Sequence, residues 1–318
     1  MNRPPTGHQP HRRDSEQRHI DHADRAGARA GARADVRTGD GLAYRRGVLL
    51  ALPAVVPVVL VLGGSLAAAA AQSLGLMPFI GAPTLSTRGW SGSTSELGQS
   101  IAVSAYIAAI STVLALSVGF VIAVYVLAAP RMGRLVAGLS AASIPIPHLI
   151  GAGAVGLWLS DSGFLHRLLG MPEAFPALVG GPWWVAVISE YVWKESAFVA
   201  LVVIGSMSRS MRALCDSAAT LGATAWQCIL HVVLPLSAPA LTVSALIVFV
   251  YTFGAYESPW LLGATSPEPL PVRAVRLFGS VDLDARPEAM ATALVSVAAS
   301  AAAILVGVAV LGLRRNHR

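Results

Sequence analysis

Apolar residues in this chain gather in six long blocks separated by shorter polar stretches. The blocks cover residues 47–71, 98–128, 135–159, 183–205, 241–262 and 289–313. Each block exceeds the roughly 20 residues that a helix needs to cross the hydrocarbon core of a bilayer. The pattern therefore predicts an all-α, polytopic membrane protein with six transmembrane helices.

Residues 1–43 contain no such block and are rich in Arg, Ala, Gly and His. A segment of this composition buries too little apolar surface to fold by itself. We therefore predict a disordered cytoplasmic tail over residues 1–43 and a six-helix membrane domain over residues 44–318. The first apolar block ends in a run of alanines like that of a secretory leader, but its length favours an uncleaved span.

The distribution of arginine predicts which span ends face the cytoplasm, because short cytoplasmic loops carry an excess of Arg and Lys. One side of the membrane has Arg29, Arg33, Arg37, Arg45, Arg46, Arg131, Arg134, Arg209, Arg212, Arg314, Arg315 and Arg318, and the other has Arg88, Arg167, Arg273, Arg276 and Arg286. The larger group includes both ends of the chain. Both termini are therefore predicted to be cytoplasmic, with residues 206–239 as a cytoplasmic loop.

Composition agrees with a membrane protein and argues against two other functions, nucleic-acid binding and ATP hydrolysis. The chain is 54% hydrophobic and 13% charged, whereas a soluble domain carries about 25% charged residues. Most of the net charge of +6 follows from membrane orientation, so it indicates no nucleic-acid partner. The one lysine, Lys194, follows Trp193, whereas a Walker A loop needs Gly-Lys-Ser or Gly-Lys-Thr. The chain is therefore predicted not to be an ATPase itself.

The two cysteines, Cys215 and Cys228, both fall in the predicted cytoplasmic loop. Thiols stay reduced in that compartment, so we expect no structural disulfide between them. A metal site would need more ligands than the nearby His231 adds, so no metal site is predicted.

The loop over residues 206–239 carries the most specific pattern in the chain. Residues 210–220 favour a helix with small residues on one side, and Gly222 is a natural helix stop. Thr224 can cap a second helix that runs towards Pro235. Two short helices joined at Gly222 would project from the membrane surface, and their small side chains would let a partner protein approach closely.

This loop resembles the EAA loop of permease subunits of binding-protein-dependent ABC importers. The family pattern is Glu-Ala-Ala, three residues, Gly, nine residues, an aliphatic residue, one residue and Leu-Pro. The corresponding positions are Asp216, Ser217, Ala218, Gly222, Val232, Leu234 and Pro235. Asp in place of Glu keeps the charge, and Ser in place of Ala keeps the small size.

The resemblance implies a type I-like permease fold and a division of labour between subunits. A short helix of the loop would dock on a separate cytoplasmic ATPase subunit, with the contact formed by Asp216, Ser217, Ala218, Gly222, Ala223, Leu234 and Pro235. A second permease subunit, identical or paralogous, and an extracytoplasmic solute-binding protein would complete the importer in a bacterial cell membrane. ATP would be bound by the partner, so the chain is expected to hold no cofactor and to be no enzyme.

Weaker similarity to the same family extends over roughly residues 47–313. The runs Val192-Trp-Lys-Glu195 and Ile144-Pro-Ile-Pro147 resemble the stretch before the loop and the third span of such permeases. The run Phe253-Gly-Ala-Tyr-Glu-Ser-Pro-Trp-Leu-Leu-Gly263 resembles the fifth span of the polyamine-, iron- and thiamine-type branches. This branch implies a polyamine or another small cation as the substrate.

Ionisable residues inside the predicted spans are expected to face the protein interior or water. Glu190 and Lys194 are four residues apart on one helix, so they can form an intramembrane ion pair. Glu257, with Tyr256 and Trp260, lies near the outer end of the fifth span, where glycine and proline suggest a broken helix. These three residues either line an outer gate for a cation or are interfacial aromatics beside a snorkelling carboxylate.

Two other functions remain open, a secondary transporter and a non-catalytic membrane scaffold, although no convincing internal repeat favours the first. An intramembrane enzyme is not supported, because His148, His166 and His231 are scattered and no His-Glu-x-x-His motif occurs. The fifth loop, residues 264–287, is Pro-rich and predicted to lie outside, where it could contact a solute-binding protein.

Overall fold

The computed structural model describes residues 47–316, apart from residues 79, 92–93, 130, 171–174 and 208–210. The predicted tail over residues 1–43 lies outside the described residues. The chain divides into two units, Met1–Ser65 and Leu66–Arg318. The described part of the first unit is helical and belongs to the helix Gly47–Ser73, which continues into the second unit.

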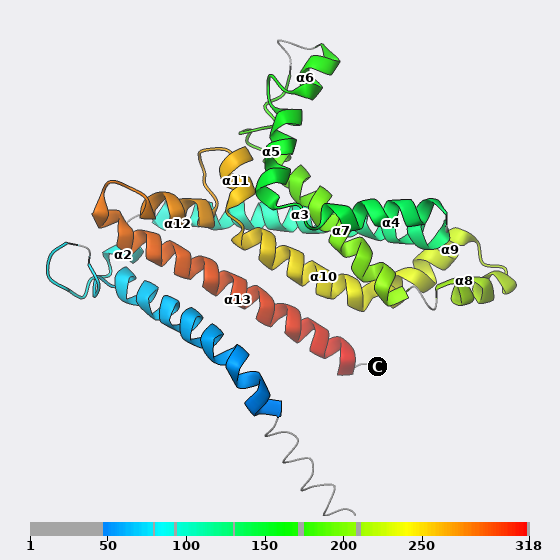
Figure 1. Cartoon of the computed structure of the whole chain (residues 1–318), viewed down its shortest axis with the longest axis horizontal. Coiled ribbons are helices and arrows are strands. Elements are labelled where there is room, and N and C mark those ends of the chain that lie inside the picture. The colour runs from blue at the N-terminus through cyan, green and yellow to red at the C-terminus, as the bar shows by residue number, and fades with distance from the viewer. Residues whose placement is uncertain are drawn as a thin grey trace, which may run out of the picture. The chain divides into compact units, whose positions relative to one another are not determined.

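The second unit is built from helices, and its described residues contain no strand (Figure 1). After the end of the helix Gly47–Ser73, the helices of this unit are α2 (Arg88–Ser91), α3 (Thr94–Ala128), α4 (Met132–Ser143), α5 (His148–Leu159), α6 (Phe164–Leu169), α7 (Val185–Met207), α8 (Met211–Thr220), α9 (Ala225–Cys228), the π-helix η1 (Ile229–Val233), α10 (Leu234–Gly254), α11 (Glu257–Leu262), α12 (Leu270–Phe278), the 3₁₀-helix η2 (Leu283–Ala285) and α13 (Arg286–Asn316).

Four stretches of helix are long and apolar enough to cross a membrane: Gly47–Ser73, Thr94–Ala128, Ala225–Gly254 and Leu283–Ala309. Two further pairs of helices are long and apolar enough only when each pair is taken together. These are Met132–Ser143 with His148–Leu169, bent by 108°, and Val185–Met207 with Met211–Thr220, bent by 67°. The described residues therefore contain four candidate spans, or up to six if each bent pair forms one. The predicted all-α membrane fold is confirmed.

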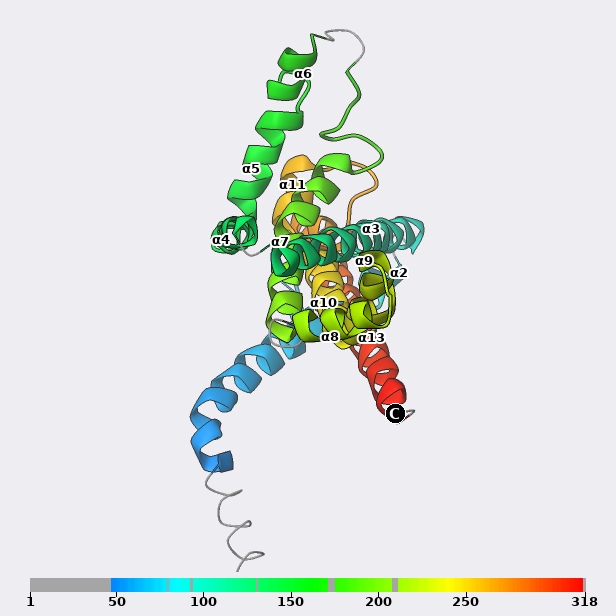
Figure 2. The same cartoon turned by 90° about the vertical axis from the view of Figure 1, so that its right-hand side faces the viewer.

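The third predicted span is broken between α4 and α5. α4 ends at Ser143 and α5 begins at His148, with Pro147 as the residue before its first turn. Proline fixes its own backbone and disfavours the helical conformation in the residue before it, so the helix cannot continue through this stretch. Figure 2 shows the result, in which α5 runs in a different direction from α4 and α6 extends beyond the other helices.

The fifth predicted span begins earlier than expected and ends in a second break. The helical stretch Ala225–Gly254 joins α9, η1 and α10, so this helix begins within the loop predicted over residues 206–239. Pro235 is the second residue of α10 and follows closely on the π-helix η1. After Gly254 the chain leaves the helix and starts again as α11, as the glycine and proline in this region suggest.

Close helix packing in the second unit depends on small residues. A Cβ atom built on Gly119 of α3 would lie 2.7 Å from the backbone oxygen of Ser196 in α7. A Cβ atom on Gly307 of α13 would lie 2.7 Å from Leu246 of α10. Helices in membranes associate through this kind of close contact, because lipid tails are as apolar as the side chains they would replace.

Candidate functional site

The helix α8 projects two of the predicted contact residues to the outside. Asp216 and Ser217 are exposed, and Met211 is the one buried residue of α8. On the opposite side, Cys215 and Ala218 pack against a buried cluster that includes Ala123 of α3 together with Val199, Val203 and Met207 of α7. One face of α8 is therefore available to a partner, while Cys215 and Ala218 on the other face contact the buried cluster.

The turn after α8 agrees with the predicted stop. Gly222 has φ of 83°, which is the left-handed region that favours glycine. Its N–H donates to the Ala219 oxygen at 2.9 Å, and the N–H of Ala223 donates to the Ala218 oxygen at 3.1 Å. These bonds satisfy carbonyls at the end of α8.

The second loop helix begins as predicted but does not end as predicted. Thr224 and Gln227 form a capping box, in which each side chain bonds the backbone N–H of the other residue. The helix then passes through η1 directly into α10 instead of stopping near Pro235. Leu234 and Pro235 therefore belong to the start of a candidate span. The sequence misleads here because a proline normally interrupts a helix, whereas the π-helical turn directly before Leu234 and Pro235 keeps the chain helical.

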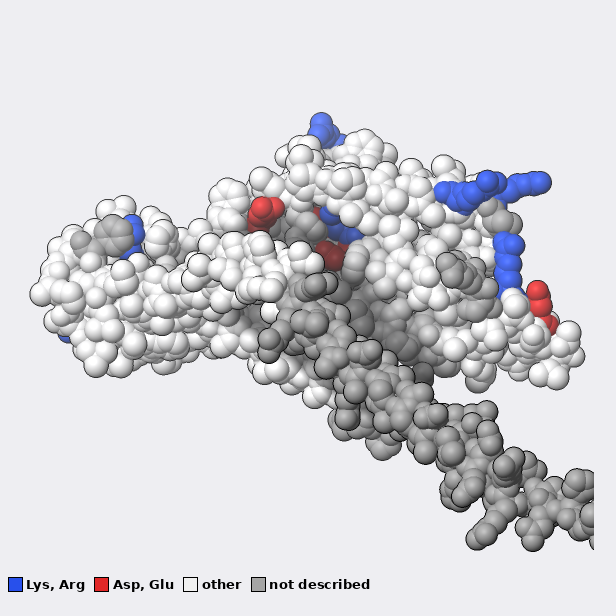
Figure 3. All heavy atoms as spheres, turned by 60° about the horizontal axis from the view of Figure 1, so that its bottom comes forward, with Lys and Arg blue, Asp and Glu red and all other residues white. Residues whose placement is uncertain are grey.

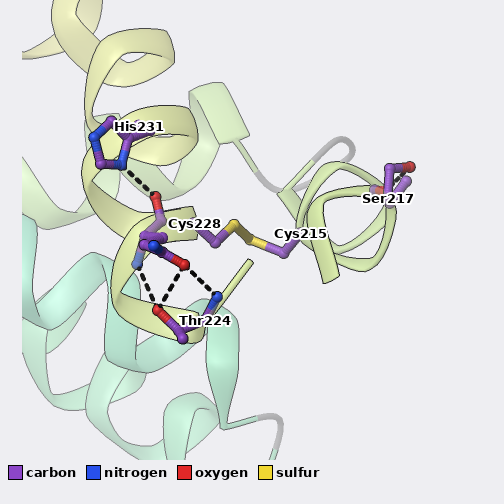
Figure 4. The surroundings of a disulfide bond; sticks show 7 residues. Cys215, Ser217, Thr224, Cys228 and His231 are labelled. Carbon is purple, nitrogen blue, oxygen red and sulfur yellow. Dashed lines mark hydrogen bonds between the residues drawn. A yellow bond between two sulfur atoms is a disulfide. The ribbon is translucent and has the colours of Figure 1, made fainter. Parts of the chain in front are cut away.

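A disulfide joins Cys215 to Cys228, contrary to the expectation of two free thiols (Figure 4). The turn at Gly222 brings α8 beside α9, and the two Cα atoms lie 5.8 Å apart, which is within the range of disulfides. The expectation rested on the compartment alone, which says nothing about distance. Figure 4 also shows that Ser217 lies on the side of α8 away from the disulfide.

Two large apolar side chains flank the glycine turn, and neither is among the contact residues predicted from the sequence. Leu221 is 89% exposed and Trp226 is 65% exposed. Exposed aromatic and aliphatic residues that insert into a pocket often contribute most of the energy of a protein–protein contact. The signal in the sequence is their position, one residue before and four residues after Gly222, in a segment between two apolar blocks.

A cavity of about 360 Å³ lies between the loop helices and the end of α3. Its walls come from the end of α3, from α8 and from α9, and they include both cysteines and Asp216. The loop helices are therefore not packed tightly against the end of α3.

Inside the membrane region, Lys194 has a different partner from the one predicted. Its Nζ atom donates to the backbone oxygens of Ser143 at 2.6 Å, Ile144 at 3.3 Å and Ile146 at 2.5 Å. An ammonium group has three N–H donors, so all of them are used at the break between α4 and α5. The predicted ion pair with Glu190 is replaced, because carbonyls left unpaired at a helix end bind the ammonium.

Glu190 is fully buried and connects three helices. Its Oε1 atom lies 2.9 Å from Nδ1 of His148 at the start of α5, and its Oε2 atom accepts a hydrogen bond from Ser258 of α11 at 3.0 Å. Nε2 of the same histidine lies 3.6 Å from Glu195. The ring of His148 also lies 4.9 Å from that of Tyr251 in α10. This polar cluster therefore holds α7 against both helix breaks.

The residues of the predicted outer gate lie together at the start of α11. Glu257 is exposed, and the rings of Tyr256 and Trp260 stack with centroids 5.9 Å apart. Figure 3 shows a mostly uncharged face with acidic and basic side chains set in a hollow near its middle. The contact of these three residues with a solute stays a prediction.

The fifth loop contains a helix, α12, and a network of charges rather than a plain connector. Arg273 of this helix donates to Glu96 at 2.8 Å and to Glu288 at 2.6 Å. Burial would lower the pKa of Arg273, but the hydrogen bonds and charges of the two carboxylates outweigh burial and raise that pKa. A polar cavity of about 520 Å³ lies beside this network.

Among the described residues, no group of three or more His, Cys, Asp or Glu side chains could hold a metal ion. The candidate site has three parts. They are the helix pair α8 and α9, the polar cluster around Glu190, and the charged network around Arg273 of α12.

Comparisons with known proteins agree with this architecture. The family described as "Binding-protein-dependent transport system inner membrane component" matches residues 130–316. No curated protein matches the chain. Among solved structures, a bacterial ABC transporter involved in the import of the acidic polysaccharide alginate has 18% identity, a TM-score of 0.67, and coverage of 81% of this chain and 92% of its own.

A second solved structure has the same fold. It is a bacterial alginate ABC transporter in complex with an alginate pentasaccharide-bound periplasmic protein, with 18% identity, a TM-score of 0.68, and coverage of 81% of this chain and 91% of its own. At this identity the likeness concerns the fold alone.

Proposed function

Because this chain belongs to the family of binding-protein-dependent transport system inner membrane components, we propose that it forms half of a solute pathway driven by a separate ATPase that docks on α8. A second permease subunit, identical or paralogous, would form the other half. An extracytoplasmic solute-binding protein would deliver the solute. ATP would be bound and hydrolysed by the partner subunits, and the chain would act in a bacterial cell membrane.

The observation that carries the docking proposal is the two-sided character of α8. Its exposed side presents Asp216 and Ser217, and Leu221 and Trp226 extend this surface around the turn. Its inner side packs on the cluster shared by α3 and α7. A partner that binds α8 would therefore act next to the cluster and next to α9, which continues through η1 into the membrane helix α10.

A small cation, such as a polyamine, is the proposed substrate class. Support comes from the exposed carboxylate of Glu257 beside the stacked rings of Tyr256 and Trp260. Aromatic faces and carboxylates attract organic cations, whereas a carboxylate repels an anionic solute. The two solved transporters are described with the acidic polysaccharide alginate, but at 18% identity their substrate is not carried over to this chain.

Co-purification from the native host in mild detergent tests the docking proposal. We expect a Walker-A-containing ATPase to accompany the tagged wild type and to be lost from Gly222→Asp. The matched control is Gly170→Asp, because Gly170 also has a positive φ of 59° and open space within 4 Å of the position that a Cβ would take, but ends α6. A correctly inserted wild type that brings no ATPase under several mild conditions would favour a secondary transporter or a scaffold instead.

A further inference from the structure

The disulfide between Cys215 and Cys228 lies in the segment that the proposed function places in the cytoplasm. Cytosolic reductants keep thiols reduced, and disulfides found there are usually transient and catalytic or redox-sensing. We propose that these two cysteines form a reversible thiol–disulfide modification site that controls how tightly the ATPase subunit docks on α8. This inference rests on the proposed function.

The two cysteines are held near each other by contacts that do not depend on the bridge. Their Cα atoms lie 5.8 Å apart, and a disulfide forms at about 4.4–6.8 Å. The bond from the Ala223 N–H to the Ala218 oxygen fixes the turn between the helices, and the capping box of Thr224 fixes the start of α9. The reduced pair therefore stays close enough to be oxidised again by a small disulfide, which takes up the two electrons and two protons as the reverse exchange re-forms the bridge.

A reductant can reach the bridge through the cavity between the loop helices and the end of α3. Both cysteines line this cavity of about 360 Å³. Cys215 is partly exposed, whereas Cys228 is 4% exposed. Cys215 is thus the more accessible of the two residues, and its sulfur is the proposed target of an attacking thiolate.

Reduction needs a dithiol as the second reactant. One thiolate of the dithiol attacks the Cys215 sulfur, the S–S bond breaks, and Cys228 leaves as a thiolate that takes up a proton. The second thiol of the reductant then attacks the mixed disulfide and releases Cys215 as a thiol. The bridge gains two electrons and two protons, and the reductant becomes a cyclic disulfide.

The bridge acts on the docking surface because it connects the two helices that carry it. Asp216 follows Cys215 directly, and Trp226 lies two residues before Cys228. Since Met211 is the one buried residue of α8, few packing contacts hold this helix in place. The bridge links it to α9, which continues through η1 into α10. A docking surface that is fixed beforehand loses less freedom on binding, so the oxidised form binds the ATPase more tightly.

The test uses the full chain in lipid nanodiscs and the ATPase that co-purifies with it. Binding is measured after oxidation with diamide and after reduction with dithiothreitol, and alkylation with mass spectrometry reports the state of the cysteines. The matched control carries Cys215→Ser together with Cys228→Ser. We expect binding to the reduced wild type to be about tenfold weaker than to the oxidised wild type, since ordering of the loop then accompanies docking. The control should bind like the reduced wild type under both conditions.

Three results would overturn the proposal. The first is equal affinity in both redox states of the wild type. The second is an equal redox response in the control, which would assign the effect to thiols of the ATPase. The third is absence of the bridge after oxidation. An ATPase that binds neither the wild type nor the control in any state would instead contradict the proposed function itself.

Discussion

Replacing Lys194 by methionine isolates the contact that closes the break in the third span. The methionine side chain has a similar length and shape but no N–H donor. The Lys194 side chain reaches three backbone oxygens at 2.5–3.3 Å, and the residue is 5% exposed. The variant therefore removes the ammonium donor from all three carbonyls, of which the Ser143 oxygen keeps a hydrogen bond from the Ile146 N–H at 3.4 Å.

The expected loss follows from what each unpaired group costs. A buried polar group that loses its partner costs about 1–3 kcal/mol, and removing one member of a buried charged contact costs about 3–5 kcal/mol. Removing the ammonium also relieves the unfavourable burial of its charge. We therefore expect Lys194→Met to lower the free energy of unfolding by about 3 kcal/mol.

Unfolding in mixed micelles of dodecyl maltoside and sodium dodecyl sulfate, followed by far-UV circular dichroism, measures this loss. The control is Arg276→Met, which removes an ion pair with Glu268 from an arginine side chain that is 54% exposed. Exposed ion pairs contribute at most about 1 kcal/mol. If Lys194→Met destabilises the protein no more than Arg276→Met does, the assigned role of the lysine is wrong.

Four further variants test other parts of the structure. Gly119→Val should lower the free energy of unfolding in the same micelles by about 1–3 kcal/mol through overpacking, because a Cβ there would lie 2.7 Å from Ser196 oxygen and from Val199; an unchanged value would mean that α3 and α7 are not in close contact. Gly222→Ala should weaken ATPase co-purification and cost about 1–2 kcal/mol, since φ is 83° while the space around it is open, and full recovery of the ATPase would argue against a left-handed turn. Arg273→Met should destabilise by the same amount at pH 7 and pH 10, because the pKa of Arg273 is raised; its contribution is complete below the ordinary pKa of arginine, which lies well above pH 10, and is lost only as pH rises through the folded-state value, so a difference that shrinks by pH 10 would contradict the assigned ion pairs. Glu257→Gln should reduce uptake of labelled spermidine by vesicles that contain the whole importer roughly tenfold, or about 1.4 kcal/mol, and unchanged uptake would remove Glu257 from the pathway.

The membrane helices could be predicted from the sequence because each one depends on a local property. Runs of more than about 20 apolar residues have no stable place in water and indicate spans. Pro147 and Gly222 act on the backbone of their immediate neighbourhood, so the break before α5 and the stop after α8 follow from single residues. The capping box of Thr224 likewise needs only a partner three residues away.

Contacts between distant segments could not be predicted in the same way. Lys194 binds carbonyls about 50 residues earlier in the chain, and Glu190 binds Ser258, which is 68 residues away. Helical spacing suggested the nearer partner, but it contains no information on unpaired carbonyls elsewhere. The disulfide was missed for a related reason, since its formation depends on a turn that brings Cys215 and Cys228 together.

Photo-crosslinking from α8 tests the central claim most directly. A benzophenone amino acid placed at position 217, whose serine is exposed, is activated in membranes of the native host, and the crosslinked proteins are identified by mass spectrometry. Position 168 in α6, where Leu168 is 67% exposed, is the control at a site outside the loop. We expect a Walker-A ATPase to be crosslinked from position 217 and none from position 168. Capture of the ATPase from position 168 alone, or from neither position while the ATPase still co-purifies, would contradict docking on α8.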